Sequence, residues 1–85
     1  MTTAVPKAQE AGAIRKRHGA AIQRYREHRE LTRKQLAAIV GVHVSALTQW
    51  EKGVTSPSDV HRIALAEHLR VPVAVLFNLE PVAVA

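Results

Sequence analysis

The stretch TRKQLAAIVGVHVSALTQWEKG, which spans residues 32–53, decides the fold of this chain. It opens with Thr32, a good helix N-cap, and Gln35 follows three positions later, so the two side chains can form a capping box. Gly41 is the residue type that most often follows the end of a helix. Together these residues predict a short helix over residues 33–40 that stops at a tight turn.

A second short helix is predicted directly after the turn, over residues 44–52, with Gly53 as its terminator. Its apolar residues Leu47 and Trp50 are spaced to share one side of the helix and to pack against the domain. The other side carries small or polar residues, which a packed helix would not need: Val44, Ser45, Thr48 and Gln49. Two short helices joined by a turn with glycine form a helix-turn-helix arrangement.

Apolar residues at helical spacing predict further helices on both sides of this pair. One runs on from about residue 20, one follows a cap at Ser56 or Ser58, and a short last one begins near Pro72. Because β-branched residues fall mainly at helix ends and turns, the expected fold class is all-α. The side chains expected to face the core are Ile22, Leu36, Ala37, Val40, Val42, Ala46, Leu47, Trp50, Val60, Ile63, Ala66, Leu69, Val73, Leu76 and Phe77.

The chain divides into three parts by composition. We expect residues 20–78 to form the folded domain, residues 1–19 to be a basic arm or an extension of the first helix, and residues 79–85 to be a short apolar tail. Residues 1–13 have little apolar periodicity, which indicates a loose segment. Gly19 is expected to break or to begin the first helix.

The composition is that of one small domain, with 85 residues of which 47% are apolar. The sequence has no cysteine, no apolar run near the roughly 20 residues of a membrane span, and no signal-peptide pattern. A soluble cytoplasmic protein is therefore expected.

Positive charge is concentrated in one block, residues 15–34, which holds eight basic and two acidic residues within a chain of net charge +5. Such a block indicates a polyanionic partner, nucleic acid first and an acidic membrane surface second, although a solvated helix face would have the same composition. Within the block, residues 15–17 either embrace DNA as an arm or lie in solvent at the start of a helix.

Catalysis and metal binding are not indicated. No two of the five histidines stand four residues apart, and no acidic residue completes a ligand set at suitable spacing. The sequence also lacks a glycine-rich phosphate loop and a nucleophile motif. We expect no enzyme activity, no metal or cofactor, and no small-molecule substrate.

The helix over residues 44–52 has the properties of a DNA-reading element. In a helix-turn-helix the second helix lies in the major groove, and its N-terminal residues face base edges. Gln49 can pair with adenine through two hydrogen bonds, Ser45 can donate to or accept from several bases, and Val44 can contact a thymine methyl group. The alternative is that these are ordinary exposed helix residues.

Taken together, these features resemble the Cro/C1-type (XRE-like) helix-turn-helix family over about residues 20–77. The resemblance rests on Thr32, Gln35, Leu36, Ala37, Gly41, Val42, Ser45, the ending WEKG at residues 50–53, Pro57, Ser58, Leu65, Ala66, Leu76 and Phe77. It implies a five-helix, lambda-repressor-like domain that binds double-stranded operator DNA, usually as a homodimer on a pseudo-palindromic site.

The resemblance implies roles for single residues as well. Thr32 and Arg33 would contact phosphate from the start of the first short helix, and Lys52 with residues 53–55 would contact phosphate on the far strand. The base-reading positions would be His43, Val44, Ser45 and Gln49, with His43 nearer the backbone and Thr48 beside them.

The resemblance also implies a partly buried structural ion pair between Arg26 and Glu51. Four positions depart from the family's pattern. His43 stands where Ser or Thr usually caps the reading helix, and Val44 stands where a polar reading residue is common. Arg70 replaces a common glycine, and Pro72 occupies the cap of the last helix.

The expected function is that of a transcription regulator similar to a phage Cro-like repressor. The alternative is an antitoxin-type protein-interaction module in which DNA binding is secondary. The oligomeric state stays open, and the candidate dimer surface is residues 73–77 together with the apolar tail.

Overall fold

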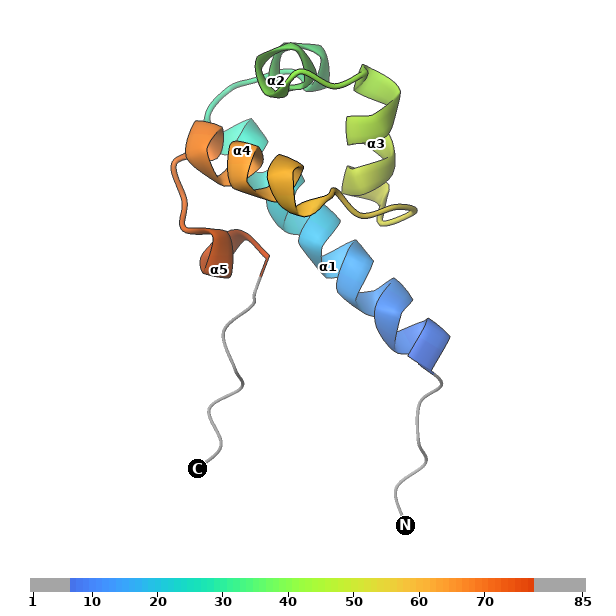
Figure 1. Cartoon of the computed structure of the whole chain (residues 1–85). Helices are drawn as coiled ribbons and strands as arrows, with labels where there is room; N and C mark the ends of the chain where they lie inside the picture. The colour runs from blue at the N-terminus through green and yellow to red at the C-terminus, as the bar shows by residue number, and fades with distance from the viewer. Residues whose placement is uncertain (1–6, 78–85) are drawn as a thin grey trace.

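The chain folds into five helices and no strand over residues 7–77, the part that the computed structural model describes, with side chains from residue 10 onward (Figure 1). The helices are α1 (Lys7–His28), α2 (Arg33–Val40), α3 (Val44–Lys52), α4 (Asp59–Leu69) and α5 (Val73–Leu76). Helix α1 packs against α3, α4 and α5, while α2 contacts α3 and α4. The expected all-α fold with five helices is confirmed.

Local capping residues set the helix ends. The Thr32 hydroxyl accepts a hydrogen bond from the Gln35 N–H at 3.0 Å, and the Gln35 side chain accepts one from the Thr32 N–H at 2.8 Å. Gly41 ends α2 in the left-handed conformation, and Ser58 caps α4. Arg70 ends α4 with φ 58°, where a residue with a side chain is strained by about 1 kcal/mol.

Helix α1 begins earlier than the sequence indicates. Residues 7–13, expected as a loose segment, are helical, and the helix passes through Gly19 without a break. The stretch around Gly19 is rich in alanine, arginine and lysine, which favour helix strongly enough to span one glycine. The expected boundary between residues 19 and 20 therefore lies inside α1. Residues 1–6 and the tail over residues 79–85 lie outside the described residues.

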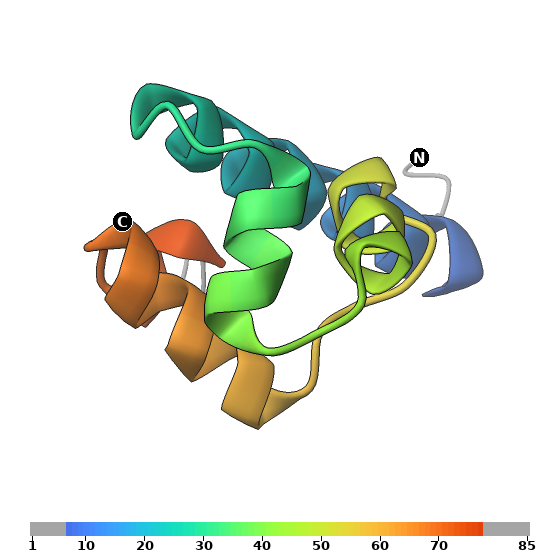
Figure 2. The same ribbon diagram turned by 90° about the horizontal axis from the view of Figure 1, so that it is seen from above.

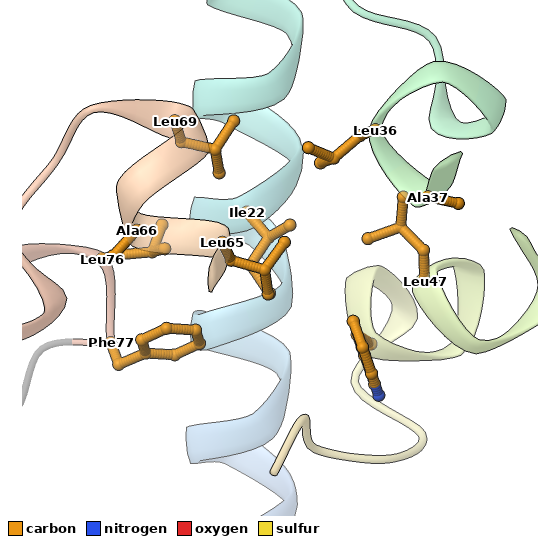
Figure 3. Packing of buried hydrophobic residues seen from close by; sticks show 10 residues of the cluster. Ile22, Leu36, Ala37, Leu47, Leu65, Ala66, Leu69, Leu76 and Phe77 are labelled. Carbon is orange, nitrogen blue, oxygen red and sulfur yellow. The ribbon is translucent and has the colours of Figure 1, made fainter. Parts of the chain in front are cut away.

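The buried core gathers side chains from all five helices around α1 (Figure 3). Ile22 of α1 lies between two groups, one from α2 and α3 and the other from α4 and α5. The buried apolar residues are Ile22, Leu36, Ala37, Leu47, Trp50, Leu65, Ala66, Leu69, Leu76 and Phe77. Val40, Val42, Ala46 and Val73, also expected inward, pack against this core in a half-buried state.

The expected inner face of α4 was partly wrong. Val60 and Ile63 are 73% and 51% exposed, and Leu65 is fully buried in their place. Three residues advance a helix by about 60° less than a full turn, so residues spaced every three positions move steadily around the helix axis and do not share one face. Val60 and Leu69, nine residues apart, therefore lie on opposite sides of α4.

None of the helices within residues 7–77 combines the length and the apolar character needed to cross a membrane.

His18 of α1 is a buried polar residue, and its ring meets the ring of Phe77 edge-on with 5.5 Å between centroids. Burial lowers the pKa of His18 below 6.5, and the positive charges of Arg62 and Arg17 lower it further, against a hydrogen bond with the backbone of Phe77 that raises it. The folded protein therefore disfavours the imidazolium form more than the unfolded chain does.

We expect the stability of the domain to fall with acidification through this histidine. A lowered pKa means that the unfolded chain binds the proton first, so the contribution of His18 is complete above pH 6.5 and is lost as the pH falls below that value toward the lowered pKa. Urea unfolding between about pH 7 and about pH 5 should show a steeper loss for the wild type than for His18→Gln. The matched variant His28→Gln, at an exposed position of the same helix, should keep the wild-type slope; equal slopes for all three would contradict the assignment.

Candidate functional site

Helices α2 and α3 meet across a three-residue turn and point in very different directions. Figure 2 looks almost along α3, while α2 lies across the view. His43 is the N-cap of α3, because its Nδ1 accepts a hydrogen bond from the Ser45 N–H at 3.2 Å. The same Nδ1 lies 2.8 Å from the Ser45 hydroxyl. His43 therefore caps α3 even though Ser or Thr is usual at this position, because its imidazole accepts the hydrogen bond that a hydroxyl would accept.

The two sides of α3 have opposite character. Leu47, Trp50 and Glu51 are buried and anchor the helix to the rest of the domain. The residues on the outward side are exposed or half-buried, and they are Val44, Ser45, Thr48, Gln49 and Lys52. The four residues that the sequence placed on the outward side of this helix are therefore accessible, and so is Lys52. Thr48 is the half-buried member, and its hydroxyl donates to the Val44 carbonyl oxygen at 2.8 Å.

Glu51 is the electrostatic centre of the site. Its carboxylate accepts hydrogen bonds from Arg26 Nε at 2.7 Å and from Arg26 Nη2 at 3.1 Å. The Glu51 side chain is 0% exposed and that of Arg26 is 9% exposed, so the pair is more completely buried than the expected partly buried one. Arg26 also donates to the Leu31 carbonyl oxygen at 2.7 Å, which ties the end of α1 to the chain before α2.

Arg33 is a second partner of Glu51 that the sequence analysis did not find. Its Nε donates to Glu51 Oε1 at 2.9 Å, and its side chain is 37% exposed. The cluster of Arg26, Arg33 and Glu51 therefore links α1, α2 and α3 and keeps one net positive charge. A carboxylate can accept several hydrogen bonds, so a carboxylate expected to be buried needs more than one donor. This need could have suggested from the sequence that Glu51 has a second partner besides Arg26.

Helix α1 holds α3 through backbone contacts at two glycines. A Cβ atom placed on Gly19 would lie 2.3 Å from the Trp50 carbonyl oxygen and 2.4 Å from that of Glu51. A Cβ atom on Gly53, which has φ 76°, would lie 2.7 Å from the Lys16 Cα. Real Cβ atoms do not approach so closely, so both positions require glycine. The orientation of α3 is thus fixed from α1 as well as from α2.

The expected site residues gather at two connected places. Thr32 and Arg33 lie at the start of α2, where Arg33 reaches α3 through Glu51. His43 and the outward residues of α3 form the other group. A helix with small and polar side chains on its outward side fits the width of a DNA major groove. The positive charge beside it is complementary to the negative charge of the DNA phosphates.

The comparisons with known proteins agree with this geometry. A family model described as helix-turn-helix matches residues 22–76. Two crystal structures of the clp gene regulator ClgR from Corynebacterium glutamicum are similar in fold, each with 25% sequence identity over 76% of this chain. The TM-scores are 0.72 and 0.70, with 69% and 84% of the respective ClgR chains covered. No curated protein matches the chain.

Proposed function

Since the chain belongs to the Cro/C1-type helix-turn-helix family of DNA-binding transcription regulators, we propose that it is a Cro-like repressor that reads a specific operator with α3. One observation carries this proposal. Helix α3 is anchored through Leu47, Trp50 and Glu51, and it presents an outward side free of bulky aromatic residues. Such a helix can enter the major groove without rearrangement.

Base recognition is proposed for three residues of the outward side. Gln49 is exposed and has the amide geometry for paired hydrogen bonds with adenine. Val44, 36% exposed, can contact a thymine methyl group. The Ser45 hydroxyl lies within hydrogen-bond distance of His43 Nδ1, so we expect His43 to set the orientation in which Ser45 contacts bases. Thr48 lies beside these residues, and its hydroxyl donates a hydrogen bond to the Val44 carbonyl oxygen.

Backbone contacts are proposed for Thr32, Arg33, His43 and Lys52, together with residues 53–55. Arg33 would use its terminal Nη groups for phosphate, because Glu51 already accepts from its Nε. Glu51 therefore orients the guanidinium before DNA arrives, which lowers the ordering cost of the contact.

We also propose that the repressor binds a pseudo-palindromic operator as a homodimer. Within the candidate surface at residues 73–77, Leu76 and Phe77 are buried in the core, so they are not available to a partner. Val75 is 46% exposed. A separate groove of about 470 Å³ between α4 and α5 has Ile63 and Val73 in its wall.

Selection from a pool of random duplex DNA at physiological salt, followed by sequencing, tests the proposed function. We expect enrichment of an inverted repeat with half-sites about one helical turn apart. A single short site would overturn the homodimer and keep the sequence-specific regulator. Absence of enrichment would overturn the repressor and favour the antitoxin-type interaction module.

Gln49→Ala should lose discrimination at one or two base pairs while the affinity for unrelated DNA stays unchanged. A good base pair contact contributes about 1–3 kcal/mol of discrimination. Lys52→Ala is the contrasting variant: it should weaken binding to all sequences alike and lower the salt slope by about one. Competition binding against single-base operator variants measures the discrimination, and the affinity across a range of salt concentrations measures the slope. An unchanged base preference in Gln49→Ala would mean that α3 does not read the operator with this residue.

A further inference from the structure

The first half of α1 lies directly against the end of α3. The Lys16 N and Cα atoms would be only 2.8 Å and 2.7 Å from a Cβ atom on Gly53, so the two backbones are in contact. Arg15 strengthens this contact, since its Nε donates to the Gly53 carbonyl oxygen at 3.4 Å. This segment is thus a fixed part of the domain and not a loose arm.

The same segment carries positive charge without local neutralisation. Residues 11–26 contain no acidic residue, and Lys16 is exposed. The ion pairs among residues 10–77 involve only Arg26, Arg33 and Glu51, so they leave Arg15 and Lys16 out. Lys52, also exposed, stands at the end of α3 next to Gly53. Lys16 and Lys52 therefore border the Gly53 turn from two different helices.

We propose that Lys16, supported by Arg15, is a further DNA-backbone contact that binds the phosphates next to those held by Lys52 and residues 53–55. This inference rests on the proposed function, which brings residues 52–55 to the DNA backbone. A duplex carries one charge for about every 1.7 Å of its axis, so a cation beside that turn meets neighbouring phosphates. Because the glycine contacts hold α1 in place, the contact needs little ordering on binding.

The test compares Lys16→Gln with Arg24→Gln. Both variants remove one positive charge from α1, but Arg24 lines a cleft with Val75 and Leu76 beside α5. Circular dichroism first establishes that both variants are folded. Affinity for the duplex enriched by selection is then measured across a range of salt concentrations, and phosphate ethylation interference maps the contacted phosphates.

We expect Lys16→Gln to lower the salt slope by about one and to lose interference at one or two phosphates, with an unchanged base preference. Arg24→Gln should keep every interference position of the wild type. Equal effects of the two variants, or an unchanged phosphate map in Lys16→Gln, would overturn the contact. Failure of the proposed function would show separately, as absence of an enriched sequence for the wild type.

Discussion

Replacement of Gly19 by alanine is expected to destabilise the domain and to weaken its binding to DNA. The added Cβ would lie 2.3 Å from the Trp50 carbonyl oxygen and 2.4 Å from the Glu51 carbonyl oxygen. Both are backbone atoms, so α1 and α3 must move apart. Overpacking of this kind costs about 1–3 kcal/mol, and here it acts against the gain of about 1 kcal/mol that alanine brings to a helix.

Gly12→Ala is the matched control, because it makes the same change in the same helix. At Gly12 the nearest atom to an added Cβ is the Arg15 Nη2, at 3.8 Å, which is ordinary van der Waals contact. This variant should be more stable than the wild type by up to about 1 kcal/mol, through helix propensity alone. For a domain of this size, a change of 1 kcal/mol shifts the melting temperature by roughly 4–8 °C.

Thermal unfolding of the two alanine variants therefore gives shifts of opposite sign. A stabilised Gly19→Ala variant would show that α1 and α3 do not cross in backbone contact. The affinity for DNA adds a second readout, measured at a temperature where both variants are folded. Gly19→Ala should bind more weakly because α3 is displaced, whereas Gly12→Ala should bind as the wild type does.

The sequence predicts the central part of the fold well because its signals are local. The capping box of Thr32 and Gln35 joins residues three apart, and Gly41 and Gly53 end their helices in the conformation that glycine favours. The outward side of α3 follows from the spacing of Leu47 and Trp50. None of these signals depends on a distant part of the chain.

The remaining features depend on residues that are far apart in the sequence. Gly19 looks like a possible helix breaker until its contact with Trp50, 31 residues later, is known. Arginine is a residue type that commonly contacts phosphate, so the sequence suggests that role for Arg33. Its hydrogen bond to Glu51 becomes visible only when α2 and α3 are placed together. The face of α4 was predicted wrongly for a different reason. Val60 and Ile63 were joined to Leu69 by steps of three residues, which do not stay on one side of a helix, and the buried side runs instead through Leu65 and Leu69.

Glu51→Gln is expected to have the largest effect on stability among single substitutions in the site. Glutamine keeps the volume and removes the charge, so Arg26 would remain 9% exposed without its carboxylate partner. Loss of one member of a buried ion pair costs about 3–5 kcal/mol, which is a large part of the stability of a small domain. Glu27→Gln, at an exposed position of α1, is the control and should change stability by less than about 0.5 kcal/mol.

The double variant Arg26→Gln, Glu51→Gln separates the charge from the packing. If the unpaired charge causes the loss, removal of Arg26 as well should restore part of the stability, because no fully buried charge then lacks a partner. Urea unfolding of the two single variants and the double variant gives the coupling energy directly. Additive losses would mean that Arg26 and Glu51 act independently. A loss in the double variant that is smaller than the sum of the two single losses would instead identify Arg26 and Glu51 as an energetically coupled pair between α1 and α3.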